Sequence, residues 1–119
     1  MANPNLVSAS AIYGKVAGAA LTDTSADIVT NGSSSGKLYK VNAIYCANID
    51  GTDAAPVTVG VYDSSATATY YLASTITVPA DTTIDLLSKS IYLEEGDKIV
   101  ANSSGADLVT ILVSYEELS

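Results

Sequence analysis

Several residue types that carry chemistry are missing from this chain. The 119 residues include no histidine, tryptophan or phenylalanine, and all five cations are lysines, so arginine is absent as well. Without imidazole the chain cannot form a Ser-His-Asp triad, a Cys-His dyad or most zinc sites. The thirteen acidic residues and the net charge of -8 argue against a phosphate-binding groove. We therefore predict no enzyme, no metal, no cofactor and no nucleic-acid partner.

Cysteine occurs once, as Cys46, so an internal disulfide is excluded. It lies in the apolar segment from Val41 to Ile49 without a cationic neighbour, and we expect a small buried side chain rather than a reactive thiol. The first residues lack the basic start and apolar run of a signal peptide, and no window reaches the ~18–20 apolar residues of a membrane helix. We expect a chain made in a cytoplasm, with no membrane partner.

The pattern of residues is typical of an all-β chain, because short runs of Val, Ile, Thr and Tyr alternate with Gly, Asn, Asp and Ser. The most regular run is Lys37 to Ile49. Its alternation predicts one face made of Tyr39, Val41, Ala43, Tyr45, Ala47 and Ile49. The Asp50-Gly51 pair that follows predicts a hairpin to the next run, Pro56 to Asp63.

Further strand-like runs continue to the end of the chain. They are Tyr70–Val78, Thr82–Leu87, Ser90–Leu93, Lys98–Ala101 and Leu108–Tyr115, with weaker runs at Leu6–Tyr13, Ala17–Thr22 and Asp27–Thr30. About eight strands at ~8–12-residue spacing predict an all-β fold, a single antiparallel β-sandwich over residues 1–119. The sandwich is jelly-roll-like or immunoglobulin-like.

Acidic clusters are expected to be solvated. The Glu94-Glu95-Gly96-Asp97 turn lacks the spacing of a calcium loop, and we interpret it as a turn that discourages edge pairing. We interpret Glu116-Glu117 as a charged strand end.

All eight aromatic residues are tyrosines. Tyr39, Tyr45 and Tyr115 fall on apolar faces and are predicted to lie in the core. The adjacent Tyr70 and Tyr71 must point to opposite faces of a strand, so one of the pair should project outward as an interface anchor.

Charged residues make up only 15% of the chain, below the roughly 25% of ordinary domains, and the mean hydropathy is +0.29. We expect neighbouring subunits to cover part of the surface. Residues 1–12 are predicted to form an extended arm that adds to a neighbour, with a frayed terminus as the alternative. The candidate interface residues are Leu6, Val7, Ile12, Tyr70 and Tyr71.

Two C-terminal segments carry a resemblance to a known group. Ser90–Asp97 (SIYLEEGD) and Val113–Glu117 (VSYEE) resemble small virion structural proteins of tailed bacteriophages, especially cyanophages and other marine phages. The turn at Asn48–Thr52, followed by Val57–Val59, is similar too, and the likeness covers roughly residues 37–119. The resemblance implies a β-sandwich used as a head decoration (cement) protein or as a neck, tail or fibre component, without catalytic residues.

We therefore predict a non-enzymatic virion structural protein, assembled in the host cytoplasm. Its predicted partners are the major capsid protein or neck and tail proteins, and capsid decoration is favoured over a neck, tail fibre or adaptor role. A homo-oligomer is expected from the sparse charge, and a trimer from fold analogy alone. The alternative class is a carbohydrate- or receptor-binding module, for which Tyr70, Tyr71 and the Glu94–Asp97 turn are the candidates.

Overall fold

The computed structural model describes residues 8, 10–104 and 108–119, and within them it is all-β with no helix. Nine strands are found in these ranges. They are β1 (Ile12–Ala20), β2 (Ala26–Thr30), β3 (Leu38–Asn48), β4 (Ala55–Asp63), β5 (Ala68–Val78), β6 (Thr83–Asp85), β7 (Ile91–Leu93), β8 (Lys98–Ser103) and β9 (Val109–Leu118). The predicted antiparallel sandwich is confirmed.

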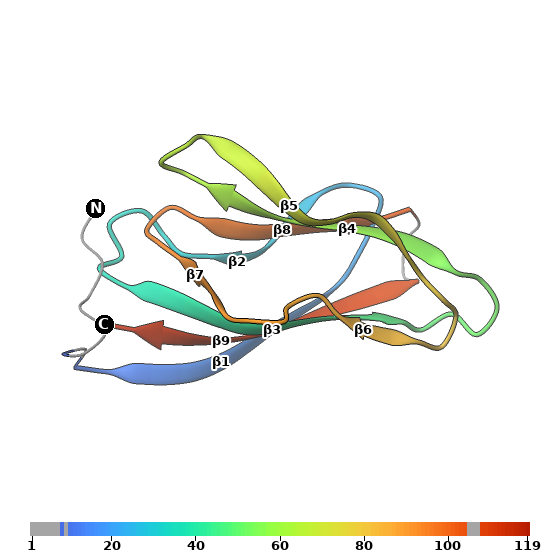
Figure 1. The fold of residues 1–119 in the computed structure, drawn as a ribbon, viewed down its shortest axis with the longest axis horizontal. Coiled ribbons are helices and arrows are strands. Elements are labelled where there is room, and N and C mark those ends of the chain that lie inside the picture. Colours follow the sequence, from blue (N-terminus) through green and yellow to red (C-terminus); the bar gives the residue numbers. More distant parts are fainter. Residues whose placement is uncertain (1–7, 9, 105–107) are drawn as a thin grey trace.

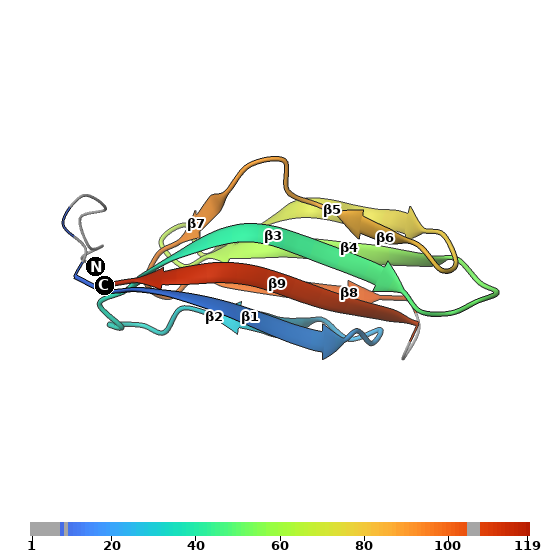
Figure 2. The ribbon, with the colours of Figure 1, turned by 90° about the horizontal axis from the view of Figure 1, so that it is seen from below.

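The strands form two antiparallel sheets stacked face to face in a slab of 48 × 26 × 20 Å (Figures 1 and 2). Sheet A has the order β1-β9-β3-β6, with β7 also paired to β3, and sheet B has the order β2-β8-β4-β5. The chain changes sheet at every connection except β4–β5 and β6–β7. With β6 and β7 taken as one interrupted strand, this is the order of an eight-stranded jelly roll, which decides against the immunoglobulin-like alternative.

The Asp50-Gly51 turn does not close a hairpin, so that prediction was wrong. It connects β3 in sheet A to β4 in sheet B. The Asp50 carboxylate accepts hydrogen bonds from the N–H groups of Thr52 at 2.8 Å and Asp53 at 3.4 Å, which turns the chain locally. A local turn motif bends the backbone, but long-range packing decides which strand the chain pairs with after the turn.

A β-bulge in β3 corrects the predicted face of this strand. The register with β9 shifts between Val41 and Ala43, so the alternation changes phase there. Val41 points inward before the shift, and Ile44 and Cys46 are fully buried after it. Tyr45 instead lies on the outer face and is 40% exposed. The prediction of one continuous apolar face was therefore wrong for the second half of the strand.

Residues 12–20 form one long strand, β1, where the sequence predicted two separate runs, Leu6–Tyr13 and Ala17–Thr22. Gly14 and Gly18 lie inside it without breaking it, and all nine residues pair with β9. Just before β1, the N–H groups of Ser10 and Ala11 donate to the carbonyl of Ser119. The predicted arm over residues 1–12 otherwise falls mostly outside the described residues.

The core between the sheets is aliphatic, with Leu21, Ile44 and Ile99 among its largest fully buried side chains. Near one end the rings of Tyr39 and Tyr115 stack with their centroids 5.2 Å apart, as their apolar setting predicted.

Cys46 is fully buried in the core. Burial raises the pKa of its thiol to about 11, so the side chain behaves as a small hydrophobe at neutral pH.

Glu117 is a buried anion, so its prediction as a solvated strand end was wrong. Its two carboxylate oxygens lie 3.0 Å from the Nζ atoms of Lys15 and Lys37. Burial by itself raises the pKa of Glu117, but the hydrogen bonds from the two lysines outweigh it and hold the pKa below its usual range. Burial and the nearby Glu117 together raise the pKa of Tyr39 to about 12.

The acidic turn between β7 and β8 also folds inward. Glu95 and Asp97 are buried, which contradicts the prediction of a fully solvated turn. The Glu95 carboxylate accepts a hydrogen bond from the N–H of Gly36 at 2.7 Å. The Asp97 carboxylate accepts from the N–H groups of Ser64 and Glu94, each at 2.9 Å. These bonds tie three connections together at one end of the sandwich.

Two buried asparagines hold the crossovers. The Asn31 amide donates to the carbonyls of Lys37 and Leu93, each at 2.9 Å. The Asn48 amide donates to the carbonyl of Val78 at 2.9 Å. Each side chain therefore satisfies backbone groups that β-pairing leaves open where the chain passes between sheets.

We expect Glu117→Gln to lower the free energy of unfolding by about 1–2 kcal/mol at neutral pH, because it removes charge-assisted hydrogen bonds to Lys15 and Lys37. The loss is limited because both lysines are partly exposed to solvent, which weakens these ion pairs. The folded-state pKa of Glu117 is depressed, so its contribution is present above the unfolded pKa of about 4.3 and is lost as pH falls through the folded value. Denaturant unfolding from pH 7 to pH 3 measures this.

The matched control is Glu116→Gln, on the outward-facing neighbour, which should change stability little at any of these pH values. An equal loss for both variants, or a Glu117→Gln loss that persists at pH 3, would contradict the prediction.

Candidate functional site

The outer face of sheet A exposes apolar side chains. Five of them define what we call the sheet A face: Ile12, Val16, Tyr45, Tyr92 and Leu112, each 40% to 66% exposed. The outward positions of β1 add no charge, because they are Ile12, Gly14, Val16, Gly18 and Ala20. Apolar residues gathered on one face of a small domain are typical of a surface that contacts another protein.

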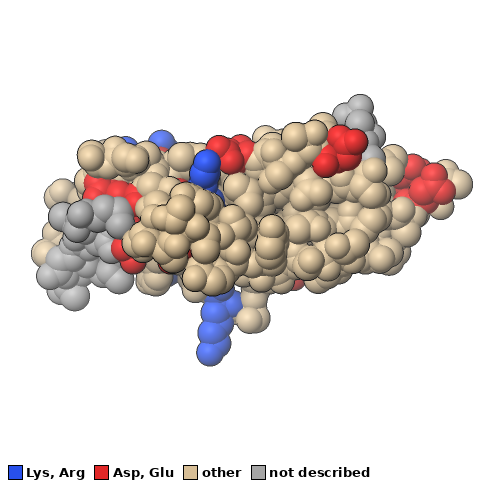
Figure 3. Space-filling view, turned by 90° about the horizontal axis from the view of Figure 1, so that it is seen from above, with Lys and Arg blue, Asp and Glu red and all other residues tan. Residues whose placement is uncertain are grey.

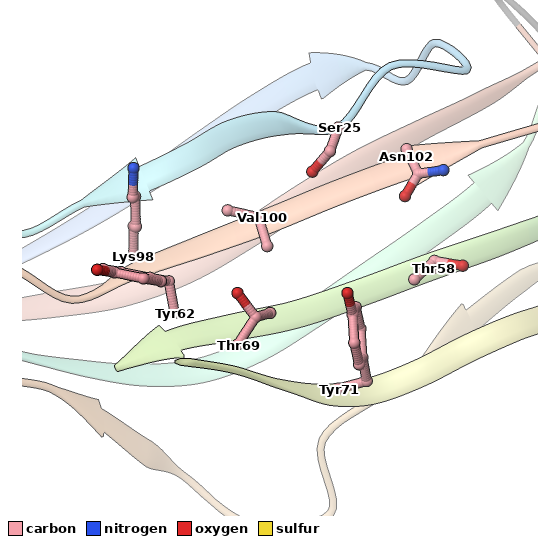
Figure 4. Close-up of a pocket in the computed structure, with 8 residues that line it drawn as sticks. All are labelled: Ser25, Thr58, Tyr62, Thr69, Tyr71, Lys98, Val100 and Asn102. Atoms are coloured by element: carbon pink, nitrogen blue, oxygen red, sulfur yellow. The ribbon is translucent and has the colours of Figure 1, made fainter. Parts of the chain in front are cut away.

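The outer face of sheet B is different, since a groove of about 430 Å³ crosses it (Figure 4). Its lining residues come from β8, β4, β5 and the residue just before β2: Ser25, Thr58, Tyr62, Thr69, Tyr71, Lys98, Val100 and Asn102. Uncharged residues cover most of this face (Figure 3). The lining offers hydroxyl and amide groups beside two aromatic rings.

Gly60 accounts for the depth of this groove. It faces outward between Val100 of β8 and Tyr71 of β5. A Cβ atom at this position would lie 2.8 Å from the Thr69 methyl group and 3.1 Å from the Tyr71 ring. The glycine therefore lets both side chains lie close to the sheet surface.

Lys98 forms one wall of the groove together with Tyr62. Its Nζ atom lies 5.3 Å from the centroid of the Tyr62 ring and 3.1 Å from the Asp27 carboxylate. The cation is therefore held in place and largely balanced, so the groove has no strong net field to attract an anion.

A second hollow, of about 320 Å³, is lined by residues of β5 and β7. Tyr70, Leu72 and Ile91 are among its lining residues. Tyr70 shares the inward face of sheet B with Val61, but sheet A does not cover it, and its side chain is 59% exposed.

The predicted interface residues do not form one site. Leu6 and Val7 lie outside the described residues, and Ile12 is exposed at the start of β1. Tyr70 and Tyr71 are both exposed and point to opposite faces of β5. Tyr71 lines the sheet B groove, and both residues border the hollow between β5 and β7. The interface role of all five stays a prediction.

Sequence reasoning missed Val16, Leu112 and Tyr62, because nothing local marks an outward apolar residue as exposed.

Within the residues that the structure describes, no three acidic or cysteine side chains gather closely enough to hold a metal ion. No helix in these ranges is long and apolar enough to cross a membrane.

Comparisons with known proteins point to the fold. No protein-family model matches the sequence, and no curated protein matches it significantly. A solved Bacillus endospore appendage, described as a disulfide-linked pilus, is similar with a TM-score of 0.55 at 16% identity, covering 92% of this chain and 87% of that one. The acid-stable capsid of Helicobacter pylori bacteriophage KHP30 gives 0.52 at 13% identity, covering 93% and 90%.

A pentameric capsid protein from metagenomic phage sequences is a weaker match, with a TM-score of 0.45 at 18% identity, covering 87% of this chain and 62% of that one. At these identities the likeness establishes the class of fold, a jelly-roll sandwich shared with proteins of phage capsids and spore pili.

We expect Gly60→Ala to destabilise the protein by about 1–3 kcal/mol, because the new methyl group must displace Thr69 or Tyr71. Chemical denaturation measures the change. Gly32→Ala is the control, since a Cβ atom there meets nothing within 4 Å. Equal stability of the two variants would contradict this prediction, because it would show that Thr69 and Tyr71 can move aside without lowering the free energy of unfolding.

Proposed function

We propose that this chain is a non-enzymatic structural protein of a phage virion. The observation that carries the proposal is the sheet A face, whose five exposed apolar side chains share the outer side of the sheet with Lys40, Glu116 and Asp85. The similarity in fold to a phage capsid protein over nearly the whole of both chains supports it. An apolar face on a small sandwich is stabilised when a neighbouring subunit covers it.

Within the virion we favour a capsid decoration role, in which the sheet A face contacts the major capsid protein and the sheet B groove faces outward. The two broad faces of the slab are chemically unlike, as a protein bound to a surface on one side requires. Each single contact can be weak, because the symmetry of a head multiplies it.

Decoration predicts that labelled protein added to particles lacking it binds over the whole head. Leu112→Lys, on the sheet A face, should reduce binding by at least about tenfold, since it buries a charge in the contact. Val100→Lys is the control on the opposite face. Electron microscopy of the label and occupancy per particle are the measurements.

Label confined to the neck or tail would contradict decoration and support the tail fibre or adaptor alternative. Equal binding of both lysine variants would remove the sheet A face as the contact.

A second candidate function, glycan binding, is favoured by the sheet B groove. The side chains of Ser25 and Asn102 line the groove together with the exposed Tyr71 ring. Neutral hydroxyl and amide groups beside aromatic rings suit a sugar, whose faces are apolar and whose edges carry hydroxyls.

If the groove binds glycans, Tyr71→Ala and Tyr62→Ala should each weaken binding on a glycan array by about tenfold, or ~1.4 kcal/mol. Tyr70→Ala is the matched control, because Tyr70 is equally exposed but faces the other side of β5. If all three variants bind the glycan as the wild type does, the groove is excluded as the glycan site. The same holds if all three, including the Tyr70→Ala control, fail to bind.

A further inference from the structure

The four sheet edges differ in how well they are protected against pairing with another chain. β6 and β7 have three residues each, β2 has five with a register shift, and β5 has two register shifts against β4. Short or bulged edges are the usual means of preventing unwanted pairing. β1 has neither feature, since its nine residues pair with β9 without a shift.

The pairing pattern shows which backbone groups of β1 are open. Ala11 and Ser119 exchange hydrogen bonds in both directions, and Leu21 donates to the Val109 carbonyl at 2.9 Å. Because such pairs alternate along an antiparallel ladder, the odd-numbered residues of β1 bond to β9. The N–H and C=O groups of the even-numbered ones point away from β9: Ile12, Gly14, Val16, Gly18 and Ala20.

The open edge is also free of the charge that would repel another copy. All thirteen acidic residues of the chain lie after residue 22, and Lys15 is the one charged residue before it. The Lys15 ammonium is engaged by Glu117 at 3.0 Å on the inward side of sheet A. Figure 2 shows β1 as the outermost strand of this sheet, next to β9.

We propose that β1 pairs antiparallel with β1 of a second copy of this chain, about a two-fold axis at Val16. Val16 then lies opposite Val16 of the partner subunit. The bulky first half of the strand meets the small second half, since Ile12 lies opposite Ala20 of the partner subunit and Tyr13 opposite Ala19 of the partner subunit. The sequence of this one strand is thus complementary to itself in size, and in this register its one charged residue, Lys15, does not lie opposite itself.

Other registers are poorer. A slip of one residue places open N–H groups against residues whose groups already bond to β9. A slip in which the two-fold axis moves to Lys15 places two ammonium groups opposite each other and shortens the paired segment by two residues. The register centred on Val16 pairs the whole strand. It also places each even-numbered residue opposite an even-numbered residue of the other copy, so that every open N–H or C=O group faces another open group.

This pairing joins the two copies of sheet A into one continuous sheet, so the two sheet A faces lie side by side. The contact is isologous and closes with two subunits, where fold analogy suggested a trimer. It concerns the purified chain and does not depend on the proposed virion role.

Light scattering on a size-exclusion column tests the proposal with charge variants. The wild-type chain should have twice the 12.2 kDa mass of one chain. Val16→Lys and Val16→Glu should each be monomeric, because like charges face each other at the axis. A mixture of the two variants should return to the doubled mass, and Val100→Lys, on the other sheet, should stay dimeric.

Disulfide trapping tests the register. In a hydrogen-bonded antiparallel pair the Cα atoms lie about 5.5 Å apart, within disulfide range, so Val16→Cys should form a covalent dimer on oxidation. Ile12→Cys is the control, since it is similarly exposed but lies far from Ile12 of the partner subunit. The native Cys46 is fully buried and does not compete.

A wild-type monomer, or a dimer that survives Val16→Lys, would overturn the proposal. So would cross-linking of Ile12→Cys as readily as Val16→Cys. If the chain is a monomer and Val16→Cys does not cross-link on oxidation, the β1 edge is available to pair with a strand of a different protein instead.

Discussion

The pairing of β3 with β9 in the middle of sheet A is the constraint on which the rest of the structure depends. β1 is attached to the sheet through β9, and β6 and β7 through β3. The bulge between Val41 and Ala43 then decides which side chains each half of β3 turns inward. Before the bulge the inward residues are Tyr39, which stacks on Tyr115, and Val41. After it they are Ile44 and Cys46. The same phase change places Tyr45 outside, so one local irregularity shapes both the core and the outer face.

Few charges are present, and several of them stabilise the interior rather than the surface. Glu117 holds two lysines at the end of sheet A, and Asp97 caps backbone N–H groups of two connections. Asn31 and Asn48 act in the same way with neutral groups. A jelly roll moves between its sheets at most connections and leaves backbone groups without strand partners there. Buried side chains of this kind satisfy them, because an unpaired buried amide or carbonyl costs about 1–3 kcal/mol.

The surface that remains is divided by chemistry. Sheet A presents apolar side chains and the open edge of β1, while sheet B presents a groove lined by tyrosine, hydroxyl and amide groups. This division fits the proposed role, in which the protein contacts neighbours on one side and solution on the other. Self-pairing through β1 would double the area of the apolar face without covering it. Weak contacts to a larger surface would then act in pairs, which raises their combined affinity.

The sequence by itself determined the all-β class, most strand positions from Leu38 onward, and the burial of Cys46, because period-two alternation and turn residues are local signals. It also limited the chemistry, since a chain without histidine or arginine lacks the groups that most sites need. Only the tertiary structure decided that Asp50-Gly51 crosses between sheets, that Glu117 is buried, and that Tyr71 shares a groove with Tyr62. Each of these depends on which distant strand lies alongside, and a bulge of one residue reverses every face beyond it. Pairing partners and bulges arise from long-range packing, for which a single sequence carries no local signal.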